Sequence, residues 1–210
     1  MAETLGDESQ PVSKVEIIDT ECFLIRNALC LSEQWTLFKY IQSKDKTPAT
    51  KPAMVPSPKT LVLGDNGVPT LSFEFGEKSI INSLIEKANK LMREAKIPSK
   101  NNFQVYKGIS MATIKYESPN QKLPPHVDHV HGFVYLMSLG CAANFMVKGP
   151  SQKKDFKFCS GDMLIFDSST EAKILHGISS IDSTIKNEKL CKHFPVMDNH
   201  RFGVQCRIQL

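Results

Sequence analysis

The chain of 210 residues is 41% hydrophobic and 23% charged, which is ordinary for a globular protein and enough for one well-packed domain with loops and tails. Its formal net charge of +4 permits a nucleic-acid partner without requiring one. Six cysteines are scattered with no C-x-x-C pair, which excludes a zinc ribbon and the dense cysteine spacing of a small secreted disulfide fold.

The amino-terminal residues carry acidic side chains and no apolar run, so we expect neither a signal peptide nor a transit peptide. The longest apolar stretch, at 134–147, is too short to span a bilayer. We therefore expect an intracellular protein of the cytoplasm and/or nucleus, monomeric and without a membrane partner. Residues 1–13 are polar and aperiodic and predict a flexible tail, and residues 14–210 are expected to form one domain.

The domain is expected to begin with a strand and a helix. Apolar residues at 15–18 predict the strand, and residues 23–29 predict a turn that leads into the helix. Ser32 is the expected N-cap, because its hydroxyl can accept a hydrogen bond from the first turn. Aromatic and aliphatic residues at helical spacing then continue the helix to Gln42.

The next segment is predicted to be a loop, a hairpin and a second helix. Four prolines at 45–60 leave no room for a regular element. A Gly-Asp-Asn-Gly turn at 64–67 predicts a hairpin between 60–63 and 70–75. Apolar residues at three-to-four spacing predict an amphipathic helix over 78–96.

From about residue 103 the apolar pattern changes to short runs rich in aromatic and β-branched residues, separated by Gly, Pro, Asn and Ser. Many short strands at near-regular spacing are typical of a β-sandwich or jelly roll. The predicted strands are 110–116, 133–139, 144–147, 156–158, 163–166, 174–178 and 202–210. The chain is therefore expected to be helical first and β-rich second.

Three residues in the β-rich half are candidate metal ligands. His126 and Asp128 are two residues apart, and on a strand residues i and i+2 point to the same face. His176 lies 50 residues downstream in another short apolar run. Two histidines and one carboxylate with open positions are the ligand set of non-haem Fe(II) oxygenases. His129 and His131 fall on the opposite face of the same run and are more simply explained as surface histidines.

Two arginines close the chain on one face of its last predicted strand. Arg201 and Arg207 are six residues apart, and apolar residues occupy the alternate positions. A guanidinium binds a carboxylate through two parallel hydrogen bonds. The pair therefore suits a dicarboxylic acid that also chelates the metal, although two surface arginines on an edge strand would give the same pattern.

Taken in this order, His126-x-Asp128, His176 and Arg201-x5-Arg207 resemble the motifs of the AlkB family of Fe(II)/2-oxoglutarate-dependent dioxygenases. Tyr116, ten residues before His126, stands where that family has a tyrosine that contacts 2-oxoglutarate. Ser-Leu-Gly at 138–140, Gly-Asp-Met-Leu at 161–164 and the hairpin at 58–67 also resemble the family. The resemblance covers residues 15–210.

The resemblance implies an α+β fold: a double-stranded β-helix (jelly roll) with N-terminal helices packed against it. It implies Fe(II) and 2-oxoglutarate as cofactors, with no catalytic side chain beyond the metal ligands. Arg201 would bind the distal carboxylate of 2-oxoglutarate with Tyr116, and Arg207 would lie near the metal, braced against Asp128. Oxygen would convert 2-oxoglutarate to succinate while a substrate C–H bond is hydroxylated, and a hydroxylated N-methyl group would leave as formaldehyde.

The chain departs from the family pattern at several positions, and the link from Asp128 to Gly140 is short and lacks the carboxylate that reads the base in some members. Ile114 and Gly203 stand where members often have asparagine, both beside 2-oxoglutarate. Pro58 and Leu63 replace the Arg and Tyr of the hairpin that helps to hold a flipped base in members that act on nucleic acid. The residues that would bind the substrate are therefore not predicted.

Three functions follow. The first is oxidative demethylation of N-methylated bases in DNA or RNA, for which methylated nucleic acid is the partner. Lysines that could line a basic groove for it, or simply form a solvated surface, are Lys51, Lys59, Lys107, Lys115, Lys153, Lys154 and Lys157, the last three expected in a turn. The second is hydroxylation or demethylation of a protein side chain by an enzyme of the same family. The third is a catalytically degenerate interaction module.

Overall fold

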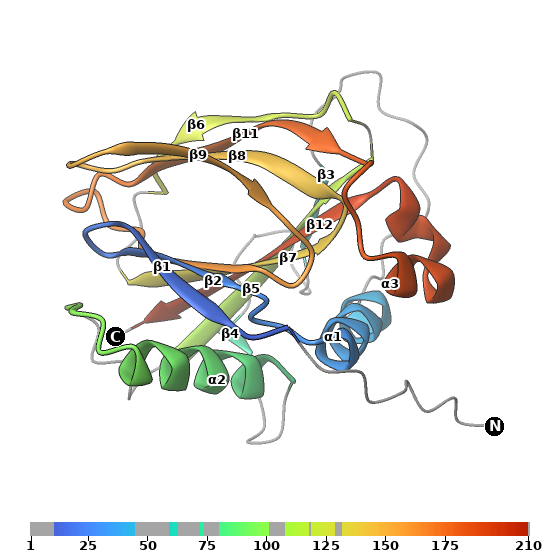
Figure 1. Cartoon of the computed structure of the whole chain (residues 1–210), viewed down its shortest axis with the longest axis horizontal. Coiled ribbons are helices and arrows are strands. Elements are labelled where there is room, and N and C mark those ends of the chain that lie inside the picture. The colour runs from blue at the N-terminus through green and yellow to red at the C-terminus, as the bar shows by residue number, and fades with distance from the viewer. Residues whose placement is uncertain are drawn as a thin grey trace.

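The computed structural model describes residues 11–44, 59–62, 72–73, 80–100, 108–117, 119–128 and 132–209. Two facing antiparallel sheets form the body of the protein (Figure 1). The larger sheet has the order β1-β2-β10-β7-β12-β5-β3, with β4 also paired to β5, and the smaller has the order β6-β11-β8-β9. This is the predicted double-stranded β-helix, or jelly roll, with helices on one side.

The strands of the larger sheet are β1 (Lys14–Asp19), β2 (Cys22–Arg26), β3 (Lys59–Val62), β4 (Ser72–Phe73), β5 (Gly108–Tyr116), β7 (Phe133–Gly140), β10 (Met163–Asp167) and β12 (Arg201–Gln209). Those of the smaller sheet are β6 (Leu123–His126), β8 (Ala142–Lys148), β9 (Lys153–Phe158) and β11 (Leu175–Asp182). The strands predicted from residue 110 onward are therefore present, most of them a few residues longer than expected.

The helices are α1 (Leu31–Lys44), α2 (Ile80–Glu94) and α3 (Glu188–His193), followed by the short 3-10 helix η1 (Pro195–Asp198). α1 and α2 lie against the outer face of the larger sheet (Figure 1). α2 agrees with the amphipathic helix predicted at 78–96, of which residues 78 and 79 lie outside the described part. No helix in the described ranges is long and apolar enough to cross a membrane.

The larger sheet separates two hydrophobic clusters because neighbouring residues of a strand point to opposite faces. On β2, Phe23 and Ile25 join the cluster under the helices, whereas Cys22 and Leu24 join the cluster between the sheets. All four side chains are almost fully buried. Both faces of the larger sheet are thus covered, and the second cluster surrounds the space in which the candidate ligands lie.

The prediction that residues 23–29 form a turn was wrong. Residues 22–26 are strand β2, which pairs with β1 on one side and β10 on the other. A short apolar run buried on both faces has no alternation to identify it as a strand. Ser32 is likewise not the N-cap, because α1 begins at Leu31, and Glu33 Oε2 instead accepts a hydrogen bond from the Cys30 amide at 2.7 Å.

The predicted hairpin was also wrong in its pairing. β3 and β4 both pair with β5, at residues 112–115 and 109–110 respectively, so they follow one another along the same edge. The turn at 64–67 and residues 45–58 of the predicted loop lie outside the described residues, and the last two residues of that loop, 59 and 60, belong to β3. A local turn signal does not identify the strand with which each flanking segment pairs.

Candidate metal centre

The register between β6 and β11 brings two candidate ligands together. His126 pairs directly with His176, and the centroids of the two imidazole rings are 4.4 Å apart. Asp128 lies two residues beyond the end of β6, so its position does not follow from strand alternation as the sequence had indicated. One ligand atom from each of His126, Asp128 and His176 nevertheless lies within 4.8 Å of the others.

The two imidazoles are held in different ways. His176 is 4% exposed and lies near the rings of Phe166 and Phe145, at centroid distances of 4.6 and 6.3 Å, and its burial lowers its pKa to about 4. It is therefore neutral at physiological pH, the state in which a histidine binds a metal. His126 Nδ1 lies 3.0 Å from the Pro124 carbonyl oxygen and must carry the hydrogen there, which leaves Nε2 facing Asp128 at 3.4 Å.

The carboxylate of Asp128 is 5% exposed and has a partner on each oxygen. Gln205 Nε2 donates to Oδ2 at 2.9 Å, and Arg207 Nη2 lies 3.7 Å from Oδ1. Burial alone would raise the pKa of Asp128, but its contact with His126 and the positive groups nearby, Arg207 among them, hold that pKa below its ordinary value. Arg207 thus lies beside Asp128, the place that the family resemblance implied.

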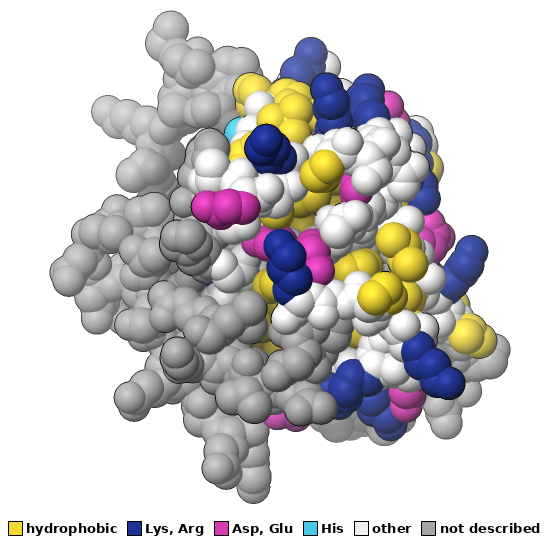
Figure 2. All heavy atoms as spheres, turned by 90° about the vertical axis from the view of Figure 1, so that its left-hand side faces the viewer, with side chains coloured by type: hydrophobic (Ala, Val, Ile, Leu, Met, Phe, Trp, Pro, Cys, Tyr) yellow, Lys and Arg dark blue, Asp and Glu magenta, His cyan; other side chains and the backbone are white. Residues whose placement is uncertain are grey.

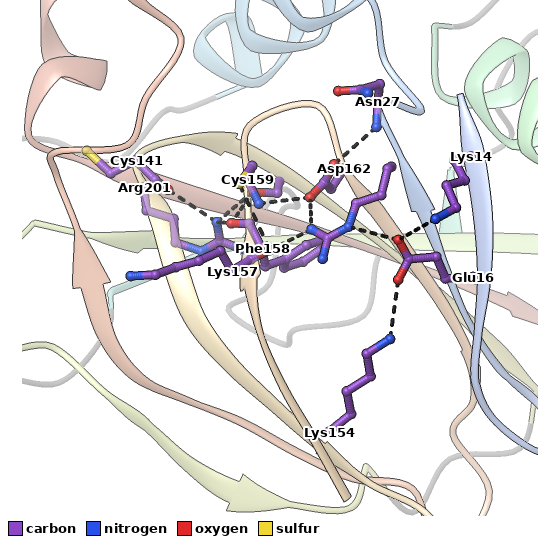
Figure 3. Close-up of polar contacts among 12 residues, drawn as sticks. Lys14, Glu16, Asn27, Cys141, Lys154, Lys157, Phe158, Cys159, Asp162 and Arg201 are labelled. Carbon is purple, nitrogen blue, oxygen red and sulfur yellow. Dashed lines mark hydrogen bonds and ion pairs between the residues drawn. The ribbon is translucent and has the colours of Figure 1, made fainter. Parts of the chain in front are cut away.

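Arg201 is the largest fully buried side chain of the described residues. Its Nη1 donates to Ser138 Oγ at 2.5 Å. It also donates to the Phe158 carbonyl at 3.1 Å and to the Cys141 carbonyl at 3.3 Å (Figure 3). Its Nε and Nη2 are buried and have no hydrogen-bond partner among the described residues. Burial lowers the pKa of Arg201 to about 10, so the guanidinium is still charged at neutral pH.

A small cavity of about 30 Å³ between the two sheets is lined by both imidazoles and by this guanidinium. Tyr116 pairs with Arg201 across β5 and β12 and also faces the cavity, and burial raises its pKa to about 12. Its phenol therefore keeps its proton and can donate. The full lining is Ile114, Tyr116, Leu123, His126, Val134, Leu136, Phe145, Phe166, His176, Ile178, Arg201, Gly203 and Gln205.

These residues fit a divalent metal ion and a dicarboxylic acid. Two imidazoles and one carboxylate can bind the metal through the nitrogen and oxygen atoms that Fe(II) accepts. The buried donors of Arg201 require an acceptor, and a carboxylate matches the geometry of a guanidinium. The apolar wall between the two ends keeps water away from a ligand that spans them. Gln205 was missed in the sequence, although it lies on the same face of its strand as the two predicted arginines.

The lysines give little support to a continuous basic groove. Lys153, Lys154 and Lys157 lie on strand β9, not in a turn as expected, and they form ion pairs with Asp155, Glu16 and Asp182 at 2.9, 3.3 and 2.5 Å. Lys115 similarly pairs with Glu117 at 3.0 Å. In Figure 2, acidic, polar and hydrophobic side chains separate most of the Lys and Arg side chains, although a few gather along the upper edge. The side chains of Lys51, Lys59, Lys107, His129 and His131 lie outside the described part.

No protein-family model matches the chain, and no curated protein matches its sequence. Solved structures do match. OsALKBH1 aligns over 94% of this chain and 100% of its own, with a TM-score of 0.62 and 19% sequence identity. The chain has an AlkB-like double-stranded β-helix fold.

Two prolyl hydroxylases share this AlkB-like fold more distantly. A prolyl-4-hydroxylase of Pseudomonas putida aligns over 90% of this chain and 92% of its own, with a TM-score of 0.55 and 10% identity. A prolyl hydroxylase of Trichoplax adhaerens, in complex with a peptide fragment of the hypoxia inducible factor oxygen degradation domain, gives the same TM-score and identity over 90% and 84%. At these identities the likeness is one of fold, and the chemistry has to be argued from the site.

Proposed function

We propose that the protein is an Fe(II)/2-oxoglutarate-dependent dioxygenase. One observation carries the proposal: a single cavity has two imidazoles of a three-ligand cluster at one end and a buried, partly unpartnered guanidinium at the other. A buried cation with unsatisfied donors is unfavourable unless a ligand completes it. An anion that reaches from the metal to Arg201 satisfies both ends at once.

Each residue has a task in this scheme. His126, Asp128 and His176 hold the ion, and Arg201 Nε and Nη2 together with the Tyr116 hydroxyl bind the distal carboxylate of 2-oxoglutarate. When bound, Fe(II) and 2-oxoglutarate supply oxidising chemistry, in which O2 yields succinate, CO2 and a hydroxylated substrate carbon. The side chain of His126 is 38% exposed whereas His176 is buried, so the substrate approaches from the His126 side.

For the substrate, we propose an N-methylated base in DNA or RNA. The greater likeness to OsALKBH1 than to the two prolyl hydroxylases supports this assignment. Hydroxylation of an N-methyl group gives a hemiaminal, which releases formaldehyde and leaves the unmethylated amine. This chemistry requires only that a methyl group reach the metal from the His126 side. It places no further demand on the cavity that binds 2-oxoglutarate.

A protein side chain is the second candidate substrate. The ion pairing of Lys115, Lys153, Lys154 and Lys157 favours it, because lysines already neutralised by carboxylates contribute less to binding phosphates. The Trichoplax prolyl hydroxylase was solved with a peptide, so the fold accommodates one.

The cofactor assignment is tested by adding Fe(II) and 2-oxoglutarate to the protein without oxygen. A visible charge-transfer band is expected for the wild type and absent for Asp128→Ala, which lacks the carboxylate ligand. Absence of the band in wild-type protein that circular dichroism shows to be folded would refute the proposal. The remaining candidate function would then be that of a catalytically degenerate interaction module.

The substrate class is tested by mass spectrometry after incubation with Fe(II), 2-oxoglutarate and O2. N-methylated oligonucleotides are expected to lose 14 mass units per methyl group and to release formaldehyde. N-methylated peptides and proline-containing peptides form the second arm. Turnover of peptides alone would assign a protein substrate, and succinate formation without any product would show that neither class is correct.

A further inference from the structure

Of the three candidate metal ligands, Asp128 is the one whose backbone is least constrained by strand pairing. His126 and His176 sit opposite one another in the ladder between β6 and β11. Asp128 lies beyond the end of β6, outside that ladder. The direction of its carboxylate must therefore be set by side-chain contacts, and the shortest that its oxygens make is with Gln205.

The contact between Gln205 and Asp128 has a defined direction. An ionised carboxylate only accepts hydrogen bonds, so the amide nitrogen of Gln205 must face Asp128 Oδ2, which it approaches to 2.9 Å. The other oxygen, Oδ1, lies 3.4 Å from His126 Nε2. One oxygen is thus engaged by an amide, and the other is turned toward the imidazole that shares the site.

Gln205 is itself fixed by the sheet. It belongs to β12, which lies between β5 and β7, and it pairs with Ala112 on one side and Leu136 on the other. Its side chain also lines the cavity. A residue in the middle of a sheet keeps its direction better than one that follows a strand end. Gln205, fixed in strand β12, is therefore in a position to orient the less constrained Asp128.

We propose that Gln205 is a positioning residue that engages Asp128 Oδ2, so that the carboxylate offers only Oδ1 to the metal ion. This inference rests on the proposed metal centre and adds a determinant of its geometry. A carboxylate that binds through one oxygen, with two imidazoles, occupies three positions and leaves the others open to exchangeable ligands. Loss of the amide frees the carboxylate to rotate and to engage the metal through both oxygens.

The test uses Gln205→Leu, which has similar volume but no donor, and the full chain freed of metal. Removal of an outer hydrogen-bond partner of a metal ligand typically weakens metal binding by about 10–100-fold. Co(II) titration by calorimetry is expected to show a loss of that size relative to wild type. Gln42→Leu is the matched control, because Gln42 is exposed on α1 far from the site and should leave Co(II) binding unchanged.

The visible spectrum of the Co(II) protein distinguishes positioning from simple support of the fold. Its d–d bands depend on the donors around the ion and on their geometry, so two-oxygen binding by Asp128 in Gln205→Leu is expected to change their position and intensity. Gln205→Met, a flexible side chain without a donor, serves if Gln205→Leu fails to fold.

Two failures can be told apart. Wild-type affinity and band intensity in the folded Gln205 variants would overturn the role of Gln205 and leave the metal centre intact. A wild type that binds no Co(II) would instead overturn the proposed function, and the inference with it.

Discussion

Arg201→Met is the substitution that tests the cavity most directly. Methionine is unbranched and fills most of the space of the arginine stem, but it carries no charge and no donor. In the structure, Nη1 already has three acceptors, while Nε and Nη2 have none among the described residues. The substitution therefore removes the two nitrogens available to a ligand, together with Nη1, whose three hydrogen bonds hold the side chain in place.

The size of the effect follows from these two free donors. A hydrogen bond to a charged group contributes about 1.5–3 kcal/mol. Two such bonds amount to about 3–6 kcal/mol, and each 1.4 kcal/mol is a tenfold change in Kd. The Kd for 2-oxoglutarate is therefore expected to rise at least about 100-fold in the variant.

The assay is anaerobic titration of the Fe(II) protein, with calorimetry or the charge-transfer band as the signal. 2-Oxopentanoate is the matched ligand, because it has the same five-carbon chain and keto acid but no distal carboxylate. It should bind wild type and variant with similar Kd. This pair of ligands and proteins forms a double-mutant cycle, so any general damage to the fold cancels.

Equal losses for the two ligands would refute the reasoning, since the lost interaction would then not involve the distal carboxylate. Unchanged affinity for 2-oxoglutarate would refute it more strongly, because the buried guanidinium would have no part in binding. Circular dichroism of both proteins establishes that the comparison is between folded states.

Three further predictions follow. Gly140→Ala should destabilise the protein by about 1–3 kcal/mol in urea unfolding, because Gly140 has φ +83° and an added Cβ would lie 2.3 Å from the His200 carbonyl oxygen. Gly203→Ala is its control: the nearest atom to an added Cβ is Leu136 Cδ1 at 3.7 Å, so stability should be retained, and a large loss would contradict the open wall of the cavity. Tyr135→Phe should lower the free energy of unfolding by about 1–2 kcal/mol, because Tyr135 Oη donates to buried Asn89 Oδ1 at 2.6 Å, and an unchanged urea midpoint would show that this bond contributes nothing net. Asp128→Asn should abolish the Fe(II)–2-oxoglutarate band while the far-ultraviolet dichroism stays that of wild type, and a persistent band would remove Asp128 from the ligand set.

The sequence was most informative where a pattern repeats over many residues. The helix at 80–94 and the strands after residue 108 follow directly from the spacing of apolar side chains. It was least informative where burial is complete, as in β2, because a strand covered on both faces loses its alternation. The prediction that His126 and Asp128 lie close together was based on both belonging to one strand, but only His126 does.

Partnerships between distant residues could not be read from the chain. Lys154 and Lys157 appeared as a basic cluster because their partners, Glu16 and Asp182, are 138 and 25 residues away. Gln205 was overlooked for the same reason, as its contact with Asp128 spans 77 residues. Such contacts depend on the register of strands, which local signals do not encode.

The placement of one candidate ligand on β6 and of another just beyond its end has a consequence for the kinetics of metal exchange. β6 is a four-residue strand at the edge of the smaller sheet, and two of its residues are prolines, which provide no backbone donor. When this segment frays, His126 and Asp128 leave together, while His176 remains within the sheet between β6 and β8. The lifetime of a bound ion would then depend on the local opening of β6. The free energy of that opening is lower than the free energy of global unfolding. A bound ion would in turn link the end of β6 to β11 through His126, Asp128 and His176.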